Sequence, residues 1–353
     1  MKKLLSLVLA LCMMLCMASV AMAEETFELA LVTDIGTIDD KSFNQGSWEG
    51  LVQYATENNI THKYYQPAEK STDAYLDSIA LAVEGGAKVI VTPGFLFEEP
   101  IYLAQDMYPD VKFILIDGEP HDADYNYRTE ANVAPILYAE QQAGYLAGYA
   151  AVKAGNTKLG FMGGMAVPAV IKFGYGFVQG AEDAAKELNV TEITMNYHYT
   201  GGFDATPEAQ AMAASWYNDG IEIIFGCGGA VGNSVMAAAE AANGKVIGVD
   251  VDQSIESETV VTSAMKGLAA SVYQTITAYY EGAFPGGVTT VKDASNNGVA
   301  LPMESNKLEG FTQEDYDALY AKLAAGEIVI PDNTTADSAD LLTTEVVKVA
   351  IFG

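Results

Sequence analysis

The sequence predicts an α/β protein built from two similar lobes. The chain has 353 residues, which exceeds one ordinary core and suits about two domains. Half of its residues are hydrophobic, which is typical of a folded globular chain. Short apolar runs alternate with amphipathic or alanine-rich stretches, and this series runs twice. Because strand–helix alternation favours mainly parallel sheets with right-handed crossovers, each series predicts one lobe.

The expected strands are mostly near-continuous apolar runs, the pattern of strands that helices cover on both faces. They are Phe27–Thr33, Lys88–Thr92, Lys112–Ile116, Lys158–Met162, Glu222–Gly226 and Lys245–Val249, with a further short strand at Thr259–Ser263. The expected helices are Phe43–Asn58, Thr72–Glu84, Pro135–Ala154, Pro168–Leu188, Pro207–Asn218, Val231–Ala242 and Leu268–Tyr280. Ser42 and Gln45 have the spacing of a capping box, which predicts that the first helix begins at Phe43.

The lobe boundaries follow from where the series ends and restarts. The first series ends near Ala131 and the second starts near Lys158, joined by the helix expected at Pro135–Ala154. The stretch after Asp252 is too short for a third lobe. We therefore assign residues 24–131 and about 263–292 to the first lobe, and residues 132–262 and about 293–353 to the second. A ligand cleft is expected between the two lobes.

Residues 1–23 have the pattern of a signal peptide. Two lysines precede an apolar run from Leu4 to Val20, and an A-x-A cleavage site ends at Ala23. The run is shorter than the roughly 20 residues of a spanning helix, so we expect cleavage after Ala23. Export to the periplasm or the outer face of the cell membrane follows. A lipid anchor at Cys12 or Cys16 is the less favoured alternative, because a leucine precedes each cysteine.

The expected mature chain is strongly acidic. It keeps 16 basic and 47 acidic side chains, a formal charge of −31, because the leader carries two lysines and no acid. We expect no nucleic-acid binding, since phosphate contacts need Lys and Arg. Only Cys227 remains, so no intrachain disulfide is expected. His62, His121 and His198 show no metal-ligand spacing and are expected on the surface. No cofactor or metal is expected, and the chain is expected to be monomeric.

Polar residues follow several strands, at the sheet edge where ligands of open α/β sheets bind. Aspartates stand at three strand ends, as Asp34, Asp117 and Asp250. A single strand-end aspartate often only caps a turn, but three of them favour a site for hydroxyl groups. Gly228 follows another strand, where a glycine lets the backbone approach a ligand. Lys266 lies near the same edge, where it is expected to bond a hydroxyl or pair with Asp250.

Three aromatic residues are candidates for a flat or apolar ligand face. Phe43 lies in the first turn of its helix at the cleft end, although it also fits a core position beside Trp48. Phe203 lies in a glycine-rich turn, where a buried aromatic is unexpected. Phe173 lies in a helix, where core packing is the more frequent use of phenylalanine.

The common catalytic motifs do not occur in the sequence. No G-x-G-x-x-G opens a helix after the first strand, and there is no P-loop and no G-x-S-x-G elbow. Asp39 and Asp40 are adjacent, and adjacent residues rarely present both carboxylates to one substrate. A Schiff-base role for Lys266 is less favoured than hydrogen bonding. We therefore expect a binding protein and not an enzyme.

The segment Asp34–Gln45 resembles the signature of the basic membrane protein family, which includes PnrA-like purine nucleoside receptors. The resemblance continues over nearly the whole mature chain, through Gly144–Gly148, Gly160–Gly164 with Pro168, Phe173–Gly180, Ile247–Gln253 and Thr262–Lys266. Members are substrate-binding proteins of ABC transporters. The resemblance implies a type I periplasmic-binding fold, with two Rossmann-like lobes joined by hinge crossovers. It also implies a small-molecule ligand and a membrane permease as partners.

The resemblance also implies roles for single residues. Phe43, Asn44 and Asp34 would line the pocket, together with the strand-end carboxylate of Asp117. The ribose hydroxyls would be held by Asp250 and Lys266. A second-lobe aromatic would complete a sandwich around the base, with Phe203 preferred over Phe173. The implied function is nucleoside capture, with a purine favoured. A binding protein for a sugar or another small polar metabolite, or a receptor for a sensor protein, remains the alternative.

Overall fold

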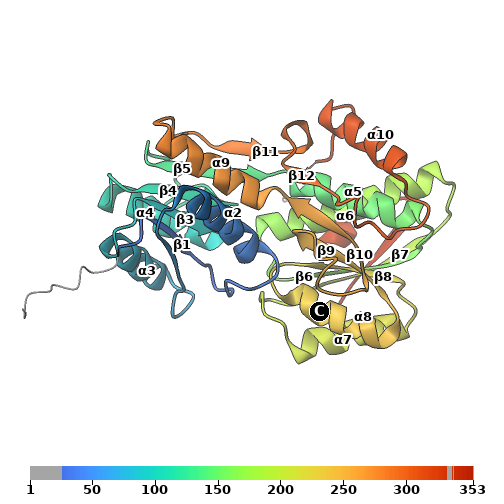
Figure 1. The fold of residues 1–353 in the computed structure, drawn as a ribbon. Coiled ribbons are helices and arrows are strands. Elements are labelled where there is room, and N and C mark those ends of the chain that lie inside the picture. Colours follow the sequence, from blue (N-terminus) through green and yellow to red (C-terminus); the bar gives the residue numbers. More distant parts are fainter. Residues whose placement is uncertain (1–25, 332–335, 337, 353) are drawn as a thin grey trace, which may run out of the picture.

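The computed structural model describes residues 26–331, 336 and 338–352, which form two α/β lobes (Figure 1). The expected signal peptide lies outside the described residues. The predicted α/β class is confirmed, because nearly all strand pairs are parallel. In the described residues, no helix has the length and apolar character needed to cross a membrane.

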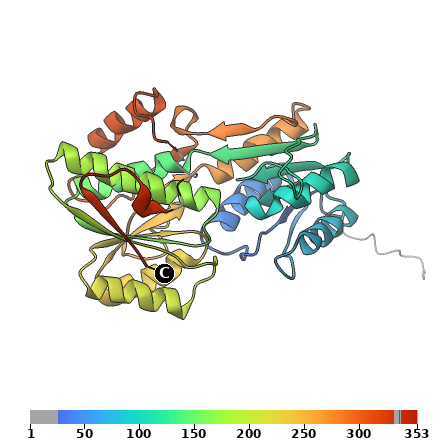
Figure 2. The same cartoon turned by 180° about the vertical axis from the view of Figure 1, so that it is seen from behind.

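The first lobe contains, within the described residues, a six-stranded sheet in the order β11-β5-β4-β3-β1-β2. Its strands are β1 (Leu29–Val32), β2 (His62–Tyr65), β3 (Val89–Pro93), β4 (Lys112–Ile116), β5 (Val133–Tyr138) and β11 (Thr290–Lys292). Helices α2 (Phe43–Asn58) and α9 (Leu268–Tyr280) cover one face. Helices α3 (Thr72–Glu84) and α4 (Glu98–Met107), with the 3₁₀ turn η1 (Phe95–Phe97), cover the other. Figure 2 shows the late strand β11, in orange, beside β5, in green.

The second lobe repeats this plan around a sheet in the order β12-β10-β9-β8-β6-β7-β13. Its strands are β6 (Lys158–Gly163), β7 (Ile193–Tyr199), β8 (Ile223–Cys227), β9 (Lys245–Asp250), β10 (Val260–Lys266), β12 (Val299–Ala300) and β13 (Val347–Ile351). Helices α5 (Glu140–Lys153), α6 (Pro168–Glu187) and α10 (Gln313–Ala324) cover one face. Helices α7 (Pro207–Asn218) and α8 (Val231–Ala242) cover the other. The short turns are η2 (Ala294–Asn296) and η3 (Ala339–Leu341).

The chain crosses between the lobes three times over residues 26–331. It crosses at Ala139, between β5 and α5, at Gly267, between β10 and α9, and after Lys292, beyond β11. The boundary expected at residue 131 is too early, because β5 belongs to the first sheet. The helix expected from Pro135 therefore begins only at Glu140. The return expected at about residue 263 is also too early, because β10 pairs with β9 of the second sheet as far as Met265.

Glycines explain how closely α5 and α6 pack. A Cβ atom at Gly144 would overlap the carbonyl oxygen of Phe173, and one at Gly148 would overlap that of Phe177. Gly176 meets the backbone of α5 in the same way. These positions are the glycines of the family-like motifs, so they are needed for helix contact and not for ligand contact. Since Phe173 lies on α6, this contact also fixes one wall of the cleft.

Candidate ligand-binding site

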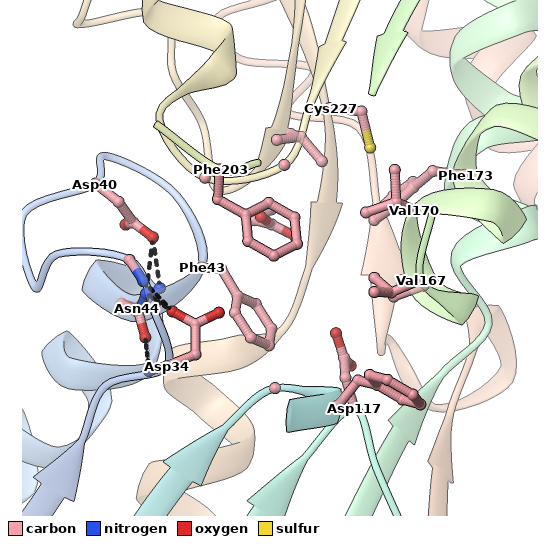
Figure 3. Close-up of a pocket in the computed structure, with 18 of the residues that line it drawn as sticks. Asp34, Asp40, Phe43, Asn44, Asp117, Val167, Val170, Phe173, Phe203 and Cys227 are labelled. Atoms are coloured by element: carbon pink, nitrogen blue, oxygen red, sulfur yellow. Dashed lines mark hydrogen bonds between the residues drawn. The ribbon is translucent and has the colours of Figure 1, made fainter. Parts of the chain in front are cut away.

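A cavity lies between the lobes, at the carboxyl ends of both sheets (Figure 3). It contains about 630 Å³ of space without atoms, counting the part that is open to solvent. The structure brings all nine expected site residues into its lining. They are Asp34, Phe43, Asn44, Asp117, Phe173, Phe203, Gly228, Asp250 and Lys266.

Further lining residues were not predicted from the sequence. They are Gly36, Asp40, Gly94, Phe95, Leu96, Val167, Ala169, Val170, Cys227, Gly229 and Val249. Asp40 carries a sequence signal, since it lies in the same loop as Asp34. The apolar side chains at the start of α6 carry none, because apolar residues in a first helical turn resemble ordinary core.

The loop between β1 and α2 positions three polar side chains of the first lobe. Asp34 Oδ1 accepts hydrogen bonds from Gly36 N at 2.7 Å and from Asn44 Nδ2 at 2.8 Å. Asn44 Nδ2 also donates to Asp40 Oδ2, so both amide hydrogens of Asn44 serve carboxylates. Asn44 therefore fixes the orientation of Asp34. Burial raises the pKa of Asp34 despite these bonds.

The capping box expected at Ser42 is wrong, although α2 does begin at Phe43. Asp40 is the cap, because its carboxylate accepts from the backbone N–H groups of Ser42, Asn44 and Gln45. Ser42 Oγ instead donates to Asp250 Oδ2 at 2.5 Å, which joins the two lobes. Burial raises the pKa of Asp40 to about 6, against the lowering effect of its three hydrogen bonds from the backbone.

Two phenylalanines face the cavity from opposite lobes. Figure 3 shows Phe43, from α2, and Phe203, from the turn after β7, pointing into the same space. Both are partly buried. Glycines make room for the Phe203 ring, since a Cβ at Gly164 would lie 2.5 Å from it and one at Gly228 3.2 Å. Gly228 also has a φ of +119°, which only glycine adopts readily.

Phe173 has a different environment. Its side chain is only 2% exposed, and its ring meets Phe225 edge-on at a centroid distance of 5.9 Å. It lines the cavity as part of the core of the second lobe. The preference for Phe203 over Phe173 as the free aromatic face is consistent with this packing.

Lys266 is the centre of the charged end of the cavity. Its Nζ lies 2.5 Å from Asp117 Oδ2, 3.5 Å from Asp250 Oδ1 and 3.6 Å from Glu140 Oε1. The ammonium also lies 4.6 Å from the centre of the Phe43 ring, a cation–π distance. Burial lowers the pKa of Lys266, but the three carboxylates outweigh this and hold the pKa above its ordinary value. Lys266 therefore stays charged, and its closest partner is Asp117 and not the expected Asp250.

Asp117 and Asp250 occupy equivalent places in the two lobes. Asp117 follows β4 and Asp250 ends β9, and both have positive φ, of 58° and 66°. Aspartate tolerates this conformation better than most residues, and it turns both side chains toward the cleft. Burial raises the pKa of Asp117 to about 6, and the charge of Lys266 opposes that rise. Among the described residues, Asp117 Oδ1 has no hydrogen-bond partner, so it is available to a ligand donor.

Glu140 is a buried carboxylate that the sequence did not single out. It begins α5, directly after the first crossover, and its Oε2 lies 3.6 Å from Lys172 Nζ. Its side chain is only 2% exposed. It links Lys172 to Lys266 behind the cavity, and so adds to the negative field that keeps Lys266 protonated.

Cys227 lines the cavity as a buried thiol. Burial raises the pKa of the Cys227 thiol well above its ordinary value, so the thiol is protonated and a poor nucleophile. Within the described residues, no group of His, Cys, Asp or Glu side chains is arranged to hold a metal ion. The surface position expected for His121 is wrong, because the residue is 7% exposed. The arrangement suits reversible binding through hydrogen bonds and ring contacts.

Two solved structures of ABC-transporter solute-binding proteins have a similar fold. An ABC-transporter solute-binding protein from Aeropyrum pernix K1 superposes with a TM-score of 0.77 at 24% identity, over 89% of this chain and 95% of that chain. One from Conexibacter woesei superposes with a TM-score of 0.69 at 23% identity, over 87% and 99%. These likenesses support the type I periplasmic-binding architecture.

Sequence comparison gives the family. Residues 27–334 match the model of the PnrA-like substrate-binding proteins of ABC transporters. The ABC transporter nucleoside-binding protein BmpA of Lactococcus lactis subsp. cremoris is 30% identical, over 86% of this chain and 88% of that protein. Basic membrane protein A1 of Borrelia garinii subsp. bavariensis is also 30% identical, over 94% and 97%. The chain belongs to the PnrA-like family of ABC-transporter substrate-binding proteins.

Proposed function

We propose that the protein captures a purine nucleoside between its lobes and delivers it to a membrane permease. One observation carries this proposal: phenyl rings from both lobes share a cavity with the Asp117–Lys266 pair. A nucleoside has the same two parts, a flat ring system and a polar sugar. The rings of Phe43 and Phe203 provide faces for the base, and base–aromatic stacking is worth about 1–3 kcal/mol per base.

The polar end of the cavity suits the ribose. Asp117 Oδ1 is buried and free to accept, and Asp250 Oδ1 lies 3.5 Å from Lys266 Nζ. Two neighbouring hydroxyls donate to carboxylates and accept from an ammonium group. Charge-assisted bonds of this kind are stronger than neutral ones. A ligand without those hydroxyls would leave buried polar groups unpaired, which gives selectivity.

The charge of the lining favours a nucleoside over its phosphates. Asp34, Asp40, Asp117 and Asp250 line the cavity, against the single cation of Lys266. A phosphate group would meet repulsion from these carboxylates at short range, in a poorly solvated site. Asp34 instead faces the base, where ring N–H groups are suitable donors.

Lobe closure couples binding to transport in this proposal. Ser42 Oγ bonds Asp250 Oδ2, and Gln253 Nε2 bonds the carbonyl oxygen of Lys41, so the lobes are in contact beside the cavity. A ligand that touches both lobes favours this closed arrangement, through rotation at the three crossovers. The name of the Lactococcus relative, a nucleoside-binding protein, supports the ligand class.

We propose further that the exported chain begins at Glu24 and acts as a monomer.

A thermal-shift screen tests the ligand class. Ligand-free protein, prepared by unfolding and refolding, is mixed with nucleosides, free bases, nucleotides, ribose and hexoses. A purine nucleoside at 100 times its dissociation constant is expected to add about 2.7 kcal/mol to the free energy of unfolding. Stabilisation by a sugar, with none by any nucleoside, would contradict the proposal.

The intact mass of the exported chain tests cleavage before Glu24. A lipid-modified Cys16 would contradict this cleavage site.

A further inference from the structure

Four charged side chains of alternating sign form a chain that reaches the charged end of the cavity from outside it. Lys172 Nζ lies 3.6 Å from Glu140 Oε2, and Glu140 Oε1 lies 3.6 Å from Lys266 Nζ. Lys266 Nζ in turn lies 2.5 Å from Asp117 Oδ2. Lys266 and Asp117 line the cavity, whereas Glu140 and Lys172 do not. We refer to these four residues as the charge ladder.

Glu140 is buried without the hydrogen bonds that usually accompany a buried carboxylate. Its side chain is only 2% exposed, and within the described residues its Oε2 has no hydrogen-bond partner. A buried carboxylate is costly unless nearby cations compensate its charge. Lys172 lies on one side of it and Lys266 on the other. The charge of Glu140 therefore couples the two lysines.

Lys172 supplies the outer cation of the ladder. It lies in α6, where its neighbours Val170 and Phe173 line the cavity. Its own side chain reaches Glu140 instead and is 19% exposed. A substitution of Lys172 therefore changes the charge behind the cavity without removing part of the cavity wall.

The ladder acts on the ionisation of Asp117. Figure 3 shows the Asp117 side chain pointing toward the cavity. Burial raises the pKa of Asp117 to about 6, the charges of Lys266 and Lys172 oppose this rise, and the charge of Glu140 adds to it. Lys172 and Glu140 therefore act on Asp117 in opposite directions. The titratable groups that interact with Asp117 come from five elements and are Lys266, Glu140, Lys172, Asp250 and Tyr138.

The ionisation of Asp117 decides how well it accepts a hydrogen bond from a hydroxyl. An ionised carboxylate accepts through both oxygens, whereas a protonated one carries a donor O–H. Hydrogen bonds to an ionised acceptor are also stronger than those to a neutral one. A ligand hydroxyl should therefore bind the ionised form more tightly, and its contribution should fall as the pH falls through about 6.

We propose that Glu140 and Lys172 are positioning residues, which hold Lys266 against Asp117 and set the charge that this pair presents to the ribose hydroxyls. Neither residue touches the ligand in this proposal. The inference rests on the proposed function, because it needs a sugar with hydroxyls at the Asp117–Lys266 pair. It goes further by placing two determinants of sugar affinity outside the cavity.

Calorimetric titration between pH 5 and pH 8 tests this role. The ligands are whichever of adenosine, guanosine and inosine binds most tightly, and the 2′,3′-dideoxy analogue of that nucleoside. The ratio of the two affinities isolates the contribution of the hydroxyls, since changes at the base end affect both ligands alike. In the wild type this ratio should fall about three- to tenfold as the pH falls through about 6, the difference between a charged and a neutral hydrogen bond.

Two single variants should move this fall in opposite directions. Lys172→Met removes the outer cation and should move it to higher pH, by about 0.5–1 pH unit. Glu140→Gln removes the carboxylate and should move it to lower pH by a similar amount. A charge within about 4–6 Å shifts a carboxyl pKa by about 1–3 units, and these two charges act from the far side of Lys266. The double variant, which loses both charges, should lie near the wild type.

Two further variants are controls. Lys172→Arg keeps the charge and should keep the wild-type profile. Lys186→Met removes a lysine from the same helix, where Lys186 pairs with the buried Glu182 at 3.1 Å, about 21 Å farther along α6. Whatever it does to the melting temperature, Lys186→Met should leave the pH of the fall unchanged.

The possible results separate this inference from the proposed function. Shifts of the two single variants in the same direction, no shift in either, or a double variant that keeps one of the shifts would overturn the positioning role while the proposed function stands. A wild-type ratio that stays constant from pH 5 to pH 8 would also overturn it.

If Glu140→Gln does not fold, Lys172→Met and Lys172→Arg decide the question. A shift to higher pH in Lys172→Met alone supports the positioning role, and equal profiles for the two overturn it. If none of the three nucleosides binds to the wild type, the proposed function fails and the positioning role fails with it.

Discussion

The ammonium of Lys266, at the end of β10 in the second lobe, bonds the carboxylate of Asp117, which follows β4 in the first. Both side chains are almost fully buried, at 2% and 6% exposed. The pair joins the lobes at the hinge side of the cleft, next to the crossover at Gly267. Breaking a buried pair leaves an uncompensated charge, so the two residues constrain each other strongly.

Asp117→Asn is expected to weaken the binding of a ribonucleoside more than the binding of its 2′,3′-dideoxy analogue. Its Oδ1 is unpaired, whereas Asp250 Oδ2 already accepts from Ser42. Loss of a hydrogen bond to a charged group costs about 1.5–3 kcal/mol, so affinity for the ribonucleoside should fall at least about tenfold. Affinity for the 2′,3′-dideoxy analogue should fall less than about threefold, because this analogue lacks the 2′ and 3′ hydroxyls that would bond Asp117. Asp250→Asn should show the same pattern with a smaller loss.

Calorimetry on folded protein measures both ligands. Equal losses for the ribonucleoside and the dideoxy analogue would show that the Asp117–Lys266 pair is only structural.

Phe43→Ala and Phe203→Ala should each weaken nucleoside binding by about 1–3 kcal/mol, the cost of removing one base–aromatic stack. Both rings are partly buried at the cavity, so the fold should survive either change. Phe352→Ala is the control, because that ring is 40% exposed and contacts Trp216 on the far side of the second sheet. Circular dichroism reports the fold. If Phe43→Ala unfolds the ligand-free protein, Phe43 is a core residue beside Trp48.

Asp40 should make the ligand-free protein more stable as the pH falls from 7 to 5. Burial raises its pKa from 3.8 to about 6 in the folded state, so between these values the folded state binds more protons than the unfolded state. Stability that this proton supplies is therefore lost as the pH rises through about 6. Asp40→Asn should have a flatter pH dependence. It should also be less stable than wild type at every pH, because the amide nitrogen cannot accept the backbone N–H bonds that one carboxylate oxygen accepts.

Urea unfolding at pH 5, 6 and 7 gives the comparison. Asp219→Asn, near the end of α7, is the surface control and should keep the wild-type slope. An Asp40→Asn variant with the wild-type pH slope would count against the raised pKa.

Gly144→Ala should destabilise the second lobe, although alanine is the better helix former. The new methyl group would overlap the carbonyl oxygen of Phe173, a backbone atom of α6 that cannot rotate away. Overpacking of this kind costs about 1–3 kcal/mol, more than the 0.5–1 kcal/mol gained in helix propensity. Gly202→Ala is the control, since its Cβ position is open. A Gly144→Ala variant as stable as wild type would contradict the close packing of α5 and α6.

Local signals in the sequence were enough to predict most helices. The bounds expected for α3 and α7 match the structure, and each helix has a real cap, from Ser71 and Thr206. The start of α2 was also predicted, but for the wrong reason, because Asp40 caps it from two residues before Ser42. Capping by Asp40 needs a conformation of the loop before α2 that the sequence pattern does not specify.

Strands were harder to predict where their pattern differs from a continuous apolar run. β7 alternates buried and partly exposed residues, so it lacks the apolar run used to find the other strands. In β5, Pro135 was interpreted as the start of a helix. It lies within a strand, and β11 pairs with β5 only from Ile136 onward, so the missing N–H is tolerated near that edge.

The candidate site was predicted from strand ends and from the family-like motif. Both point to the carboxyl edge of the sheets, and all nine residues lie in the lining of one cavity there; their contact with a ligand stays a prediction. Pairing within the site was less predictable, since the 2.5 Å bond between Lys266 and Asp117 joins residues 149 positions apart in different lobes.

Competition calorimetry between inosine and ribose tests the central claim most directly. Ligand-free protein is titrated with inosine, alone and in the presence of excess ribose, and then with ribose alone. Binding of inosine with one site per chain, unaffected by millimolar ribose, is the result that nucleoside capture predicts. Tight binding of ribose that displaces or replaces inosine would contradict it and identify the protein as a sugar-binding member of the fold.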